Sequence, residues 1–128
     1  MTIKSTGTLI DEMYTAELKA DAGSEAASDR RHALGIIVMT RMLPLITDMA
    51  KHREFHRIMR ELKDVLKQCW DAQEIVANTE MDTDEHIRII AEAGKRAQIT
   101  NAARNKLIRQ LDALLGEESQ LEKTYDKG

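Results

Sequence analysis

The residues of this 128-residue chain that could do chemistry are charged and amide side chains on the apolar faces of predicted helices. At about 100° per residue, Glu17 shares the apolar face of the first helix with Tyr14. Arg104 projects from the centre of a leucine-rich face near the end of the chain, flanked by Asn101 and Asn105. Burying one charge alone costs several kcal/mol, so such groups must pair or contact a ligand. We therefore expect Glu17 and Arg104 to meet, with the two asparagines completing the hydrogen bonds.

This inward pair has three interpretations. It can fix the register of two helices, it can line a pocket that binds a ligand, or it can form a catalytic site. A guanidinium group presents the bidentate fork that phosphates and carboxylates need, and asparagine amides give direction to the binding. A pocket near Glu17, Asn101 and Arg104 would therefore suit a small anionic molecule such as a nucleotide.

The remaining candidate residues indicate no metal and no cofactor. His52 and His56 lie four residues apart and could share a metal ion, but they sit in a charged run without a third ligand nearby. Asp71 and Glu74 resemble half of a helical carboxylate cluster for Mg²⁺, which needs further carboxylates on a second helix. Cys69 lies on an apolar stripe, which favours a buried thiol. Phosphate-binding glycine loops and the serine-hydrolase motif G-x-S-x-G do not occur.

Four helical segments must position these side chains. Helix-favouring residues dominate, and one Pro with six Gly argue against a turn-rich β fold. Their boundaries are predicted from capping residues, from glycines and from Pro44. The first helix runs from a cap at Thr8 to Ala22–Gly23, and the second from a cap at Ser28 or Asp29 to Leu43. The third runs from Pro44 to Ala77, and the last from Thr83 to Leu115, where Gly116 ends it. Pro44 either kinks the second helix or opens the third. An Asp82–Glu85 capping box is expected before the last helix.

The last two segments are unusually long, and the tight turn between them predicts an antiparallel helical hairpin. The sequence thus predicts an all-α fold, an antiparallel helical bundle built on this long hairpin. The stretch from Leu34 to Met49 is apolar almost all the way round, so its helix is either central or shared with another subunit. Self-association is the preferred interpretation, and we expect a homo-oligomer.

Composition sets the broad class. The chain is 42% hydrophobic and 32% charged with a net charge of −3, which gives no electrostatic signature of nucleic-acid binding. Its apolar runs are too short to span a membrane, and the first residues lack the long apolar core of a secretory signal, so none is expected. One cysteine cannot form an internal disulfide, so a cytoplasmic location is expected. Residues 1–128 are expected to form one helical domain, with a polar tail at 116–128.

Two separated blocks resemble a family of small helical proteins from bacteria and their phages, a domain of unknown function. The first is GTLIDEMYTAELKAD, and the second begins at CWDAQE and continues as TNAARNKLIRQLDALLGEESQLEKTY. They are similar to the family's G-x-L-I-D, W-D-x-E and T-N-x-x-R motifs, the last followed by L-L-G. The resemblance implies a helical fold and a polar site, without a known reaction. The residues that it implies are Asp11, Glu17, Lys19, Trp70, Asp71, Asn101, Arg104, Lys123 and Tyr125.

Three functions follow as expectations. The first is a non-enzymatic, oligomeric binding protein that holds a small anionic ligand, as in phage-type sequestration of a nucleotide signal. The expected ligand-binding residues are Asp11, Tyr14, Glu17, Lys19, Trp70, Asn101, Arg104, Asn105, Lys123 and Tyr125. The second is a protein–protein adaptor that docks through the apolar helix from His32 to Met49. The third is a metal-dependent hydrolase of nucleotides or phosphosugars that uses Asp11, Glu17, Asp71 and Glu74.

Overall fold

The computed structural model describes residues 3–118, and within this range every regular secondary-structure element is a helix. The elements are α1 (Thr6–Asp21), α2 (Glu25–Arg41), the 3₁₀ helix η1 (Leu43–Thr47), α3 (Met49–Asn78) and α4 (Asp84–Leu114). The predicted all-α class is confirmed. Most of the expected polar tail, with Lys123 and Tyr125, lies outside the described residues. Among the described helices, none is both long enough and apolar enough to cross a bilayer.

The helix starts differ from those that the sequence predicted. Ser5 caps α1 by accepting a hydrogen bond from the amide of Thr8, which was itself the predicted cap. Ser24, not Ser28 or Asp29, caps α2, because the helix-favouring residues that follow Ser24 extend the helix by one turn. Gly23, at φ 108°, supplies the reversal that lets α2 start at once after α1. At the last helix Thr83 is the cap, in place of Asp82.

Pro44 opens a short element of its own. The segment from Leu43 to Thr47 is a 3₁₀ helix with the proline in its first turn, where a missing amide hydrogen is tolerated. Asp48 then adopts an extended conformation and caps α3 by accepting from the amide of Lys51. The predicted helix from Pro44 to Ala77 is therefore wrong in its first turn, and α3 runs from Met49 to Asn78.

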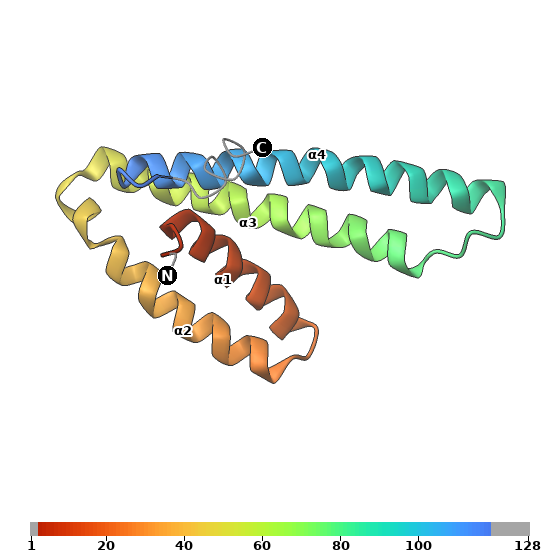
Figure 1. Ribbon diagram of the computed structural model, residues 1–128, viewed down its shortest axis with the longest axis horizontal. Coiled ribbons are helices and arrows are strands. Elements are labelled where there is room, and N and C mark those ends of the chain that lie inside the picture. Colours follow the sequence, from red (N-terminus) through yellow and green to blue (C-terminus); the bar gives the residue numbers. More distant parts are fainter. Residues whose placement is uncertain (1–2, 119–128) are drawn as a thin grey trace.

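In Figure 1, α3 and α4 lie side by side and run in opposite directions, and α1 packs against one half of this pair. The main core forms where α1 meets α3 and α4, around fully buried Ile10, Phe55, Leu62 and Leu111. Toward the α3–α4 turn the pair extends beyond α1 and α2 (Figure 1). The residues buried between the two helices in that half are smaller, namely Cys69, Ala72, Ala93 and Thr100. Any site built from several helices must therefore lie near α1.

The first turn of α1 packs directly on the last turns of α4. Glu117 accepts hydrogen bonds from the amide (2.9 Å) and the hydroxyl (2.5 Å) of Thr6, and Asp112 accepts one from the amide of Gly7 (2.7 Å). Carboxylates suit this position because a helix N-terminus has unpaired N–H groups and a partial positive charge. A Cβ at Gly7 would lie 2.5 Å from the carbonyl oxygen of Ile108, so only glycine allows this approach. The contact sets the register of α1 on α4.

The apolar second helix is not central within the chain. On α2, Ala27, Leu34 and Val38 are buried, whereas Ile36, Ile37 and Met39 are exposed. This helix packs mainly on α1 and presents its opposite side to solvent. The interpretation of α2 as a central helix is therefore wrong for the single chain.

Candidate functional site

Arg104 is bound by Asp11, not by Glu17. The guanidinium of Arg104 on α4 donates two hydrogen bonds to the Asp11 carboxylate on α1, from Nε to Oδ1 at 2.5 Å and from Nη2 to Oδ2 at 2.6 Å. The Asp11 side chain is 8% exposed and that of Arg104 is 29% exposed. The bond to Asp11 raises the pKa of Arg104 above its ordinary value, although burial acts in the opposite direction. The predicted Glu17–Arg104 pair is wrong.

The reason for this error lies in which helix covers each side of α1. The edge of α1 that carries Gly7 and Asp11 faces α4, and the contacts step by four residues along each helix, Gly7 against Ile108 and then Asp11 against Arg104. Glu17 lies about 240° further round α1. It faces α3, where its carboxylate is 3.5 Å from the ammonium of Lys63.

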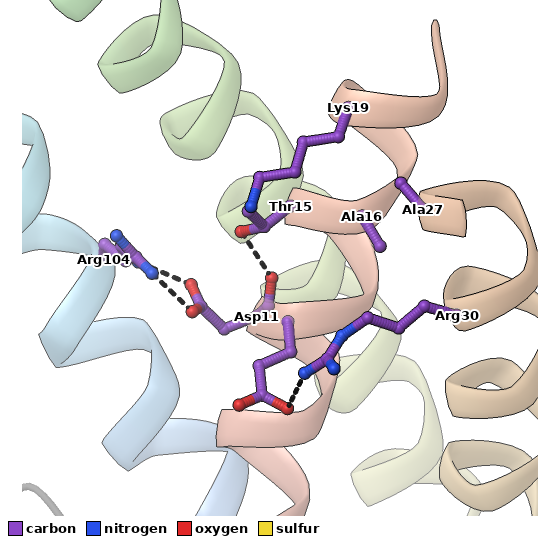
Figure 2. Close-up of a pocket in the computed structure, with 8 residues that line it drawn as sticks. Asp11, Thr15, Ala16, Lys19, Ala27, Arg30 and Arg104 are labelled. Atoms are coloured by element: carbon purple, nitrogen blue, oxygen red, sulfur yellow. Dashed lines mark hydrogen bonds and ion pairs between the residues drawn. The ribbon is translucent and has the colours of Figure 1, made fainter. Parts of the chain in front are cut away.

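Asp11 and Arg104 form one wall of a polar cavity of about 300 Å³. Figure 2 shows the pair meeting between α1 and α4, Lys19 extending back along α1 toward Thr15, and Arg30 reaching in from α2. Two alanines also line the cavity where α1 and α2 approach each other. The complete lining is Asp11, Glu12, Thr15, Ala16, Lys19, Ala27, Arg30 and Arg104.

The lining carries three cationic side chains and two carboxylates. The Asp11 carboxylate is occupied by Arg104, and the bidentate pair does not use Nη1 of that arginine. The Glu12 carboxylate is shared by Lys4 at 2.6 Å and Arg30 at 3.4 Å. Within the part of the chain that the structure describes, Lys19 has no ion-pair partner. The cavity lining therefore has a positive excess, and within residues 3–118 Lys19 is the cation of this lining that no carboxylate pairs.

Tyr14 and Glu17 belong to a different surface. They line a second cavity, of about 280 Å³, between α1 and α3 together with Lys63 and Lys67. The ammonium of Lys63 is 5.9 Å from the centre of the Tyr14 ring. Burial, reinforced by the negative charge of Glu17, raises the pKa of Tyr14. The structure thus separates these two predicted site residues from Asp11, Lys19 and Arg104.

The asparagines and the Trp70 segment are also apart from the cavity. Asn101 is exposed and Asn105 is half-buried. Among the described residues neither side chain forms a hydrogen bond with Arg104 or Glu17, so that expectation is wrong. Trp70 donates to Glu74 at 2.9 Å along the surface of α3.

The carboxylates expected for a hydrolase are not gathered at one place. Asp11 is paired with Arg104, and Asp71 accepts from Lys67 at 2.8 Å on α3. Within residues 3–118 no group of three or more His, Cys, Asp or Glu side chains could hold a metal ion. His52 and His56 pack edge to face with ring centres 4.5 Å apart. Burial and the positive charges of His52 and Arg60 lower the pKa of His56.

Sequence reasoning missed Arg30, Glu12 and Thr15 as neighbours of Arg104. Arg30 lies at the start of the predicted second helix, where no site residue was expected, and only the packing of α2 on α1 brings it to the cavity. The 18-residue separation of Glu12 and Arg30 gives no local signal. No family model, no curated protein and no solved structure matches this chain. The function must therefore be argued from the site itself.

Proposed function

We propose that the chain is a non-enzymatic, cytoplasmic helical-bundle protein, built on the α3–α4 hairpin, that binds a small anionic molecule in the cavity between α1, α2 and α4. One observation carries the proposal: Lys19, Arg30 and Arg104, from three helices, line one cavity of about 300 Å³. This volume is at the lower end of the range of small-molecule sites, about 300–1,000 Å³. It suits a phosphate group with a small substituent, such as a phosphosugar or part of a nucleotide.

The roles of the three cations differ. Arg104 is held in place by Asp11, so its guanidinium is already oriented and its Nη1 remains for a ligand. Arg30 makes a long contact of 3.4 Å with Glu12, which an anion of higher charge can replace. Lys19 has no carboxylate partner among the described residues and gains a partner on binding. A charge-assisted hydrogen bond contributes about 1.5–3 kcal/mol.

Substitution of Lys19 and Arg30 tests the proposal, because neither side chain is part of the core. Isothermal titration with inorganic phosphate, AMP and ATP at constant ionic strength measures the affinity. Lys19→Ala and Arg30→Ala should each weaken the best of these probes about tenfold or more. Arg104→Ala is unsuitable as the test because it also removes the bond that holds α1 on α4.

Lys67→Ala is the matched control. Lys67 is an exposed lysine on α3 that is paired with Asp71 and lies outside the cavity. Its loss should leave the affinity within about twofold of the wild-type value, since salt in the solvent screens the interactions of exposed charges. Equal losses of affinity in all three variants would mean that the anion is attracted by the overall charge of the protein and not by this cavity. Unchanged affinity in Lys19→Ala and Arg30→Ala would contradict the assigned site.

A further inference from the structure

A cluster of exposed aliphatic side chains covers the outer side of α2 and continues over η1 to the first residue of α3. We call it the α2–η1 face, and its members are 43–72% exposed: Ile36, Ile37, Met39, Leu43, Ile46 and Met49. Ile36 lies about 160° around the helix from the buried residues Leu34 and Val38. Ile36 thus points away from the core, and no segment of residues 3–118 covers it.

A groove runs beside this face. It has a volume of about 500 Å³ and lies between α2, η1 and the first half of α3. Its lining includes Met13, Met39, Met42 and Met59, and methionine side chains adapt readily to a partner's shape. Gly35 also lines the groove, and a Cβ there would find its nearest neighbour 3.9 Å away, at the sulfur of Met13. Packing within the chain therefore does not require a glycine in the middle of α2, where glycine is less favourable than alanine.

We propose that the α2–η1 face is the self-association surface of this protein and that its occupant is the same face of a second copy. The six side chains expose on the order of 600 Å² of apolar surface, the upper end of what a typical monomer shows in one patch. A standard protein interface buries about 800 Å² per partner, so the face by itself supplies most of the area that a stable dimer buries on each copy. The proposal is independent of the anion cavity.

The shape of the face favours a second copy as the occupant. A two-fold interface brings one patch against itself, so the patch must contain both a projection and a recess. Here Ile36 and Met39 project from α2 next to the groove that Gly35 and Met42 line. Among the described residues, the other exposed large apolar side chains are spread over several elements. They are Ile3 before α1, Val76 on α3, Met81 in the α3–α4 turn, and Ile87, Ile89 and Ile99 on α4. In the dimer, a projecting side chain of each copy enters the groove of the other.

Sedimentation equilibrium across micromolar to near-millimolar protein concentrations tests the proposal. The wild-type chain should sediment as a dimer, and Ile36→Glu should weaken dimerisation about 100-fold or more by placing a charge in a desolvated contact. Ile99→Glu is the matched control, because Ile99 is as exposed as Ile36 (63% and 58%) but lies on α4. This variant should dimerise like the wild type. Circular dichroism verifies that both variants are folded.

A second variant addresses the groove. Gly35→Leu fills the recess without removing any core side chain, so it should weaken the dimer at least about tenfold while the monomer melts no lower than the wild type. A wild-type chain that stays monomeric at all concentrations would overturn the proposal. Loss of the dimer in Ile99→Glu with its retention in Ile36→Glu would also overturn it, because the contact would then involve α4.

Discussion

The bidentate ion pair between Asp11 and Arg104 allows a quantitative prediction of how much the free energy of unfolding falls when the pair is broken. Arg104→Met keeps most of the aliphatic stem of the side chain but removes both hydrogen bonds to a carboxylate that is only 8% exposed. Removing one partner of a buried pair costs about 3–5 kcal/mol because a charge is left uncompensated. Arg104 itself is 29% exposed, so we expect the lower end of this range, about 3 kcal/mol.

The opposite substitution should cost less. Asp11→Asn leaves an arginine that can turn toward solvent, and we expect a loss of about 1–2 kcal/mol. The double variant should lose clearly less than the sum of the two, with a coupling free energy of about 2 kcal/mol. Urea denaturation followed by helical circular dichroism measures all four proteins. The Ile36→Glu background keeps any self-association from contributing to the apparent stability.

Glu17→Gln distinguishes the observed Asp11–Arg104 pair from the Glu17–Arg104 pair that the sequence alone predicted. Glu17 is paired with an exposed lysine, so its loss should cost less than about 1 kcal/mol and should show no coupling to Arg104→Met. A cost below about 1 kcal/mol for Arg104→Met, or a larger coupling of Arg104 to Glu17 than to Asp11, would refute the assignment of Asp11 as the partner.

Further predictions concern two glycines and one histidine. Gly7→Ala should cost about 3 kcal/mol in urea denaturation, because its Cβ would lie 2.5 Å from a backbone oxygen of α4 and must separate the helices. Gly94→Ala, with nothing within 4 Å of the new Cβ, should instead stabilise the protein by about 0.5–1 kcal/mol. His56 should titrate below 6.5 in NMR spectra, and His52→Ala should move its midpoint upward by removing a neighbouring positive charge. Because the pKa of His56 is lower in the folded than in the unfolded state, protonation of His56 favours unfolding, and its contribution to the free energy of unfolding falls as the pH drops through 6.5. An NMR titration midpoint of His56 above 6.5 would contradict this reasoning.

The sequence predicted what depends on local periodicity. The helical class and the approximate position of each helix follow from apolar spacing and helix propensity, and the inward position of Arg104 follows from its leucine-rich face. The partner of Arg104 does not follow in this way. Glu17 lies at the centre of the apolar face of α1, but that centre faces α3, whereas α4 covers the edge with Gly7 and Asp11. Helix periodicity gives the angle of a residue and not the identity of the helix that it meets.

The same limit applies to α2. An apolar pattern on all sides predicts that a helix is covered on more than one side, but it does not identify the segments that cover it. Here α1 covers the side with Leu34 and Val38, and no described segment covers Ile36. The contribution of α2 to the cavity was missed for a related reason, since Arg30 reaches Glu12 only through the packing of α2 on α1.

The contact between α1 and α4 also changes how the two motif blocks at the ends of the chain are interpreted. Gly7 and Asp11 come from the first block and Arg104 from the second. The contact between α1 and α4 explains all three residues, because Gly7 allows the two backbones to approach closely and Asp11 forms a buried ion pair with Arg104. Their presence therefore does not by itself indicate a ligand. Lys19 differs, because it belongs to the first block, lines the cavity and has no acidic partner in residues 3–118. If the cavity binds an anion, Lys19→Ala must weaken that binding while leaving the urea midpoint unchanged, since Lys19 is exposed and has no ion pair among the described residues to lose.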